Sequence, residues 1–218
     1  MNRLLLFLSF LMLFTACARH RMMQRVQQYN IRTIAIMPAQ LEVVGNLPRN
    51  MLPEAFQQQV EQNRRFIEQS LYTALVQFVD RRRRNLSNVQ FQSLDRTRNL
   101  LAQLNFSDSI IWQKDPAEIA RLLGVDAVVK ARVTQNRILS DGLAAGVDVV
   151  GGIINRNIPQ ANLPVSGTRT SDIFFNCELS KEGFSVWSRQ IRNATDWNYP
   201  LQMAIQNVTR RIARDFPL

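Results

Sequence analysis

The stretch "DPAEIARLLGVDAVVKARV", residues 115–133, predicts a helix that leads through one glycine into a strand. Asp115 is a favourable N-cap residue, Pro116 suits the first helical position, and Glu118 completes a capping box three residues after the cap. Gly124 stands where a left-handed C-terminal cap is expected. Apolar residues then alternate with others, as in a strand. A helix that passes directly into an apolar strand predicts an α/β unit.

The segments on both sides of this unit extend the pattern. We expect strands over 31–40, 88–93 and the two arms of a hairpin in 171–194, whose turn contains Gly183. We expect helices over 58–80, 94–106 and the C-terminal stretch after Pro200. Residues 41–59 contain Gly45, Pro48 and Pro53 and are predicted to be a connection without regular structure. Apolar residues predicted to face the core of the helices include Leu100, Leu101, Leu104, Ile119, Leu122 and Leu123.

This order of elements predicts the fold class. It is α/β: a single domain with a mixed central sheet of about four to five strands and helices packed on it. A chain of this length without its N-terminal segment is long enough for one domain with a substantial core.

Residues 1–16 have the pattern of a secretory signal peptide. Arg3 supplies a positive charge, and Leu4 to Phe14 are apolar apart from Ser9. A charged start, a short apolar middle and a small-residue exit are typical of exported proteins. The apolar run is shorter than the roughly 20 residues that a membrane-spanning helix needs.

The sequence Phe14-Thr15-Ala16-Cys17 resembles the bacterial lipobox, with Phe14 in place of the usual leucine. The resemblance implies cleavage before Cys17 and fatty acyl chains, such as palmitate, on that residue. Stable anchoring needs more than one chain, and a triacylated cysteine provides them. The alternative is an ordinary exported protein in which Cys17 is incidental. Ala18 follows the cysteine where aspartate would favour the inner membrane, so we expect an outer-membrane lipoprotein that faces the periplasm.

The expected organisation is therefore a signal peptide (1–16), a lipidated tether (17–30) and a periplasmic α/β domain (31–218). If Cys17 is acylated, Cys177 has no partner for an intramolecular disulfide. Cys177 alternates in phase with apolar neighbours in its strand, so we interpret it as a buried core residue.

The chain is strongly basic, with 27 Lys and Arg against 17 Asp and Glu and a net charge of +10. An exported protein does not meet nucleic acid in its compartment, so the expected partners are anionic lipids, envelope polymers or acidic proteins. The densest run comprises Arg81, Arg82, Arg83 and Arg84. It is either a solvated loop after a helix or a contact with an anionic surface.

Five segments resemble a known family of bacterial lipoproteins. They are "RTIAIMPAQ", "FIEQSLYTALVQF", "VQFQSLDRTRNLLAQLN", "PAEIARLLGVDAVVKARV" and "CELSKEGFSVWS". The pattern is similar to that of the curli-secretion-channel-like lipoproteins. Relatives of that family include lipoprotein activators of penicillin-binding proteins and the N-terminal domain of the periplasmic Tol–Pal translocation protein. The most specific piece is "LGVDAVV".

The resemblance covers roughly Arg32 to Leu218 and implies an anticodon-binding-domain-like fold. It also implies a nonenzymatic, lipid-anchored role in binding a partner or assembling into rings at the outer membrane. The sequence departs from the family pattern at Ala39, at Lys130-Ala131 and in the Lys-Glu-Gly turn of the hairpin.

Residues 138–164 form an apolar, Gly-rich insertion between two predicted strands. Leu143, Val147, Val150 and Ile154 would line one face of a helix there. Two interpretations stay open: a short helix that covers a sheet edge, or a surface for a partner, for self-association or for the membrane. The insertion lacks the alternation of a barrel strand, so we do not expect the pore-forming hairpin of the family's channel members.

The sequence offers little for catalysis. His20 is the only histidine and lies in the tether, and Gly151-Gly152 lacks the Lys and Ser/Thr of a phosphate loop. We therefore expect no catalytic residues, no metal and no cofactor. The expected function is a nonenzymatic envelope protein that acts as a scaffold or partner-binding component of an outer-membrane secretion or cell-wall assembly machine. The alternative is a module that binds peptidoglycan or lipopolysaccharide through its arginines.

Overall fold

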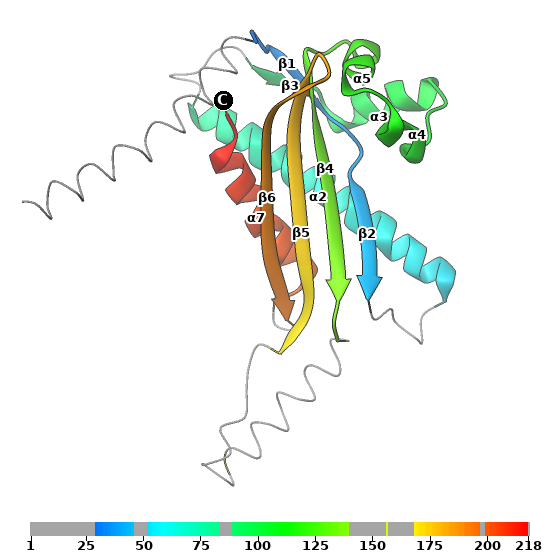
Figure 1. Ribbon diagram of the computed structural model, residues 1–218, viewed down its shortest axis with the longest axis vertical. Coiled ribbons are helices and arrows are strands. Elements are labelled where there is room, and N and C mark those ends of the chain that lie inside the picture. Colours follow the sequence, from blue (N-terminus) through cyan, green and yellow to red (C-terminus); the bar gives the residue numbers. More distant parts are fainter. Residues whose placement is uncertain are drawn as a thin grey trace, which may run out of the picture.

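A computed structural model describes residues 29–45, 52–82, 89–139, 156, 168–196 and 199–217. These residues form a mixed sheet of six strands with helices on both faces (Figure 1). The strands are β1 (Thr33–Ile36), β2 (Gln40–Gly45), β3 (Gln90–Phe91), β4 (Ala127–Arg137), β5 (Arg169–Lys181) and β6 (Phe184–Asp196). The helices are α2 (Pro53–Arg82), α3 (Leu94–Gln103), α4 (Asp108–Gln113), α5 (Pro116–Leu123) and α7 (Leu201–Asp215). The predicted α/β class with a mixed central sheet is confirmed.

The α5–β4 unit forms as its sequence predicts. The Asp115 side chain accepts a hydrogen bond from the Ala117 amide at 2.8 Å, and Gly124 adopts the left-handed conformation with φ 66°. Glu118 differs from expectation, because its carboxylate accepts a hydrogen bond from Lys114 Nζ at 2.6 Å. The N-cap and the C-cap therefore fix the ends of α5, and an ion pair replaces the second half of the expected capping box.

Strands β1 and β2 pair with successive segments of the same strand, β4. Ile34–Ile36 pair in parallel with Ala127–Val129, and Gln40–Gly45 pair in parallel with Arg132–Arg137. Pro38, which has no N–H to donate, lies in the break between the two strands. Strand β3 pairs only with β1, so no described strand pairs with the outer edge of β2.

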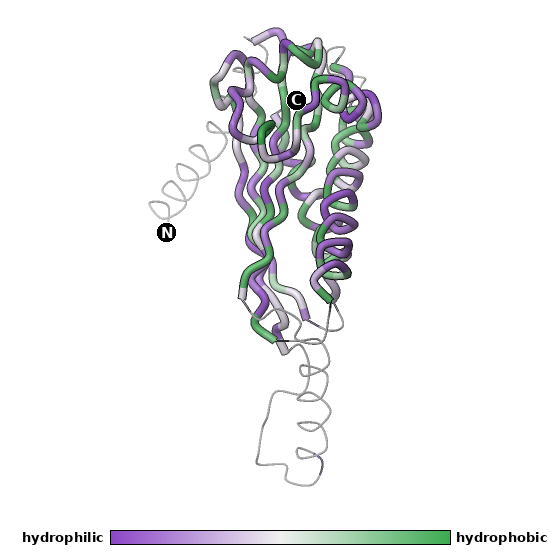
Figure 2. Tube along the Cα trace, turned by 90° about the vertical axis from the view of Figure 1, so that its right-hand side faces the viewer, coloured by the Kyte–Doolittle hydropathy of each residue, from purple (hydrophilic) through white to green (hydrophobic). Residues whose placement is uncertain are grey.

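Two layers of helix cover the sheet unequally. Helices α2 and α7 lie along one face, where Leu71 and Leu75 join Phe175 and Cys177 in the larger core cluster (Figure 2). Helices α3, α4 and α5 cover the other face only near β1 and the start of β4, in a smaller cluster around Met37. The remainder of that second face carries polar side chains, as is common for an antiparallel sheet with one solvated side.

Glu68 connects the two helical layers. Its side chain is 3 % exposed in the middle of α2, and its Oε1 accepts a hydrogen bond from the Ala39 amide at 2.9 Å. Its Oε2 accepts from Arg98 of α3, which belongs to the opposite layer. The carboxylate thus satisfies a backbone donor at the break between β1 and β2 and joins α2 to α3.

Asp126, the aspartate of the "LGVDAVV" segment, has a structural role. Its Oδ2 accepts hydrogen bonds from the amides of Arg32 (2.9 Å) and Thr33 (2.8 Å) and from Thr33 Oγ1 (2.9 Å). Partial burial raises the pKa of the Asp126 carboxyl, but these hydrogen bonds outweigh that effect and hold the pKa below its usual value. The side chain fastens the start of β1 to the start of β4.

The hairpin forms as predicted, with positive φ at both Glu182 (52°) and Gly183 (81°). Cys177 is fully buried, and burial raises the pKa of its thiol, which confirms the core interpretation.

Three local predictions were wrong. Residues 41–45 are part of β2, and α2 begins at Pro53, so the supposed connection 41–59 contains two regular elements. Leu104 and Leu122 are 37 % and 38 % exposed rather than buried. With β2 included, the sheet has six strands.

Candidate functional site

Helix α2 contributes to two grooves, one toward each of its ends. It has 30 residues and extends beyond the sheet next to β2 (Figure 1). Its N-terminal half lines a groove of about 840 Å³ beside the free edge of β2, which we call the edge groove. Its C-terminal half lines a groove of about 610 Å³ against α7, which we call the arginine groove.

The arginine groove combines four arginines from distant parts of the chain. Arg81 comes from the last turn of α2, and Arg210, Arg211 and Arg214 come from α7. The remaining lining residues are Ala74, Gln77, Phe78, Asn193, Tyr199, Asn207 and Ala213. None of these lining residues is acidic, so the groove is uniformly basic.

The hydrogen bonds of Arg210 leave its charge uncompensated. Arg210 Nε donates to the Gln206 carbonyl at 3.3 Å, and its guanidinium also donates to Asn207 Oδ1. Both acceptors are neutral. Within the described part of the chain, neither Arg81 nor Arg211 forms a salt bridge.

The neighbouring acid is already engaged outside the groove. Asp215, next to Arg214 in sequence, pairs with Arg189 of β6 at 3.1 Å. The charges of Arg81, Arg210 and Arg211 are therefore available to a ligand.

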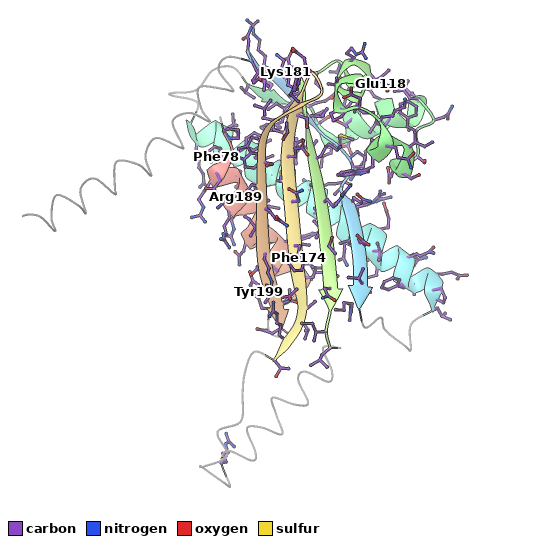
Figure 3. The ribbon with its side chains drawn as sticks, in the orientation of Figure 1. Phe78, Glu118, Phe174, Lys181, Arg189 and Tyr199 are labelled. Atoms are coloured by element: carbon purple, nitrogen blue, oxygen red, sulfur yellow. The ribbon has the colours of Figure 1, made fainter. Side chains whose placement is uncertain are left out.

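Tyr199, which precedes α7, and Asn207 of α7 form one wall of the arginine groove. Tyr199 OH donates to the Met203 carbonyl at 3.3 Å, and Asn207 Nδ2 donates to Tyr199 OH. Figure 3 shows Phe78 on α2 and Tyr199 at the start of α7. Arginine with Tyr and Asn suits an anionic, hydrogen-bonding ligand, because the planar guanidinium can hold a carboxylate or a phosphate through two bonds.

The edge groove has a different composition. Phe56 and Val60 of α2, Val43 of β2 and Trp112 of α4 supply apolar surface. Trp112 Nε1 donates to the Pro38 carbonyl at 3.0 Å, and the Arg132 guanidinium lies 5.3 Å from the Trp112 ring centroid. The groove thus pairs a partly apolar trough with a strand edge that no described strand covers.

Three charged residues of the edge groove, Glu61, Arg64 and Asp108, form a paired cluster. Arg64 bonds to Glu61 at 2.7 Å and also to Asp108 of α4. Partial burial raises the pKa of Glu61, but the hydrogen bonds and charges of Arg64 and Arg65 outweigh it and hold the pKa below its usual value. Arg64 Nε is buried and has no hydrogen-bond partner among the described residues.

The predicted site residues are distributed as follows. Arg81 is exposed and lines the arginine groove, and Arg82 is the last residue of α2. Arg83, Arg84, Cys17, Leu143, Val147, Val150 and Ile154 lie outside the described residues. The end of β4 and the start of β5, which flank the insertion, lie at the opposite end of the sheet from the C-terminal end of α2 (Figure 1).

Sequence reasoning missed most of the arginine groove. Arg210, Arg211 and Arg214 are at three- and four-residue steps on one helix, which was a usable signal for a basic face. Nothing in the sequence pattern indicated that this face would lie beside Arg81. The edge groove was missed because β2 itself was not predicted.

Two further observations bear on the kind of site. Among the described residues, no group of three or more His, Cys, Asp or Glu is placed to hold a metal ion. Within the same part of the chain, no helix is long and apolar enough to cross a membrane.

No family model and no curated protein matches the sequence. Several solved structures are similar to the domain. The C-terminal domain of LpoB from Salmonella enterica is 12 % identical with a TM-score of 0.40, over 80 % of this chain and 94 % of that one. A lipoprotein from Neisseria meningitidis is 13 % identical with a TM-score of 0.44, over 84 % of this chain and 98 % of that one.

A third similar structure is the PelC dodecamer from Paraburkholderia phytofirmans, at 11 % identity and a TM-score of 0.39. That match covers 84 % of this chain and 86 % of that one. At these identities and TM-scores, the similarities assign no function to this chain, and its role has to be argued from its own residues.

Proposed function

We propose that this chain is a nonenzymatic, lipid-anchored protein of the bacterial cell envelope that binds a partner protein of an outer-membrane secretion or cell-wall assembly machine. The lipobox-like sequence that ends at Cys17 supports the anchor and the outer-membrane location. The sequence resemblance to the curli-secretion-channel-like lipoproteins supports the kind of machine.

The observation that carries the proposal is the edge groove. The outer edge of a strand presents N–H and C=O groups with a two-residue period, which match another extended polypeptide. In this chain both β2 and β6 have an outer edge that no described strand covers, but the edge groove lies beside β2. The partly exposed Phe56, Val60 and Trp112 surround the space beside that edge. An added strand would pack on these side chains while its backbone pairs with β2.

A photocrosslinking experiment in cells tests this function. A photoreactive amino acid replaces Glu42 or Gln57, which are exposed and line the edge groove, or the exposed Gln190 of β6 as a control. We expect one discrete protein adduct from the first two positions and none from Gln190. The proposal fails if the protein fractionates with the outer membrane and yet forms no adduct at either groove position.

A second candidate function is binding of an anionic envelope polymer, peptidoglycan or lipopolysaccharide. The uncompensated charge of Arg81 and Arg211 favours it. Binding through exposed arginines weakens steeply with salt. Cosedimentation with purified peptidoglycan should then decrease between low and high ionic strength and in the variant Arg81→Gln/Arg211→Gln. Salt-independent cosedimentation would count against it.

A further inference from the structure

The arginine groove runs along α7, from Tyr199 before the start of that helix toward the end of the domain where the chain enters from its N-terminal tether (Figure 3). Its arginines come from the last turn of α2 and the C-terminal half of α7, which lie toward that end. Figure 1 shows the start of β1 and the C-terminal ends of α2 and α7 at the same end of the sheet. Tyr29 begins the described chain there, and its carbonyl accepts a hydrogen bond from Lys181 Nζ of β5. The entry point of the tether is therefore fixed to the folded domain.

We propose that the arginine groove binds the anionic phospholipid headgroups of the membrane that holds the acyl anchor, and so orients the domain on the bilayer. This inference rests on the lipid anchor of the proposed function. Anionic lipids and envelope polymers were both expected as ligands of the basic residues, and this inference assigns the arginine groove to lipids.

The length of the tether keeps the groove near the bilayer. Residues 18–28 separate Cys17 from Tyr29. A fully extended chain spans at most about 3.5 Å per residue, so this end of the domain stays within roughly 40 Å of the membrane surface. Confinement of this kind raises the effective concentration of headgroups at the groove far above that of a soluble ligand.

The charge of the groove matches an anionic surface. Arg81, Arg210, Arg211 and Arg214 gather without an acidic residue among the lining side chains. Each basic residue near an anionic bilayer increases binding about fivefold. Headgroup phosphates are also ligands that guanidinium groups hold through paired hydrogen bonds.

An acyl anchor and a basic groove act as two membrane signals. The acyl chains hold the protein on the bilayer but leave the domain free to rotate about its tether. Contacts from α2 and α7 would restrict that rotation, because these helices are packed on the sheet through Leu75, Val79, Val208 and Ile212. Docking at this end leaves β2 and its edge groove accessible to a partner.

Quenching of a fluorescent label tests the inference in the full lipidated protein. The label is placed on Gln77→Cys in the arginine groove or on Asn176→Cys on the solvated face of β5. Cys177 is fully buried and does not compete for the reagent. Vesicles contain phosphatidylcholine with or without phosphatidylglycerol, and a trace lipid carries a nitroxide quencher on its headgroup.

We expect the groove label to be quenched only when phosphatidylglycerol is present and the Asn176 label to be unaffected. The variant Arg81→Gln/Arg211→Gln should lower the ratio of docked to undocked protein about 30-fold, at about fivefold per arginine. High salt should also lower the docked fraction, because it screens the attraction between the arginines and the headgroups. The matched control Arg96→Gln/Arg121→Gln removes two exposed arginines from α3 and α5 and should leave quenching unchanged.

The two proposals fail in different ways. Vesicle flotation reports the anchor, so protein that does not float refutes the lipid-anchored function itself. Protein that floats but shows equal quenching at both labels, or no dependence on phosphatidylglycerol, refutes the headgroup site alone. Protection of the groove label by purified peptidoglycan without any response to phosphatidylglycerol refutes it too, in favour of the polymer.

Discussion

The two halves of helix α2 use the same residue type in opposite ways. In the N-terminal half, Arg64 is 22 % exposed and bonds to two carboxylates, Glu61 and Asp108. In the C-terminal half, Arg81 is exposed and, within the described chain, forms no salt bridge. An arginine held by carboxylates of its own chain supports the fold, whereas one that faces solvent without a partner retains its charge for a ligand. The contrast separates structural arginines from candidate binding arginines.

The largest effect is expected at Glu68, between the two halves. Glu68→Ala removes a buried carboxylate and leaves the Ala39 amide without its acceptor. Loss of one partner from a buried network of this kind costs about 3 kcal/mol of unfolding free energy. Urea denaturation monitored by circular dichroism measures it. Glu68→Gln keeps an acceptor for Ala39 and should cost less, and equal losses in the two variants would contradict the assigned roles.

A smaller effect is expected for Arg64→Ala in the N-terminal half. The change removes both ion pairs and the packing of the arginine stem, and should cost about 1 kcal/mol. The same denaturation assay applies. Arg65→Ala is the matched control, because Arg65 is 67 % exposed and, among the described residues, forms a salt bridge with Glu61 alone. If the control is as destabilising as Arg64→Ala, pairing to Asp108 contributes nothing.

Arg81→Ala in the C-terminal half should change the unfolding free energy by less than about 0.5 kcal/mol, because surface substitutions without partners are usually near neutral. Its effect should instead appear in binding of anionic ligands. Thermal denaturation and vesicle binding of the same preparation measure both quantities. A clear loss of stability would show that Arg81 is structural and would remove the contrast with Arg64.

The smallest effect is expected in the pH dependence of the N-terminal half. The pKa of Glu61 is lowered in the folded state, so its contribution is present above its unfolded pKa and lost as pH falls through the folded pKa. Glu61 is 39 % exposed, so this contribution is only about 0.3 kcal/mol after solvent screening. Wild type and Glu61→Gln should differ at pH 7 and converge as the pH falls below the folded pKa of Glu61. A constant difference across that range would assign the effect to something other than charge.

Local signals explain which parts of the fold were predictable. Asp115, Pro116 and Gly124 act within a few residues of themselves, so the sequence determines where α5 ends and β4 follows. The turn at Gly183 is local for the same reason. Strand β2 could not be predicted, because Gln40–Gly45 lacks clear alternation and gains its stability from pairing with Arg132–Arg137, about 90 residues away.

The candidate site was predictable only in part. Arg81 stood out in a run of four arginines, whereas the spacing of Arg210, Arg211 and Arg214 indicates a basic helix face without showing what lies beside it. Their common groove depends on how α2 and α7 pack on one face of the sheet, which is a tertiary property. Charge counts along a sequence do not reveal which charges will share a surface.

The placement of β1 between β3 and β4 has a mechanical consequence. A pull on the N-terminal tether acts along the axis of β1, so it shears the parallel β1–β4 pairing and strains all of its bonds together instead of opening them one by one. After the Lys181 hydrogen bond to the Tyr29 carbonyl, the next link to receive that force is Asp126, which holds the amides of Arg32 and Thr33. Single-molecule stretching from the N-terminal side should therefore give a lower rupture force for Asp126→Asn, and an unchanged force would show that the strain passes elsewhere.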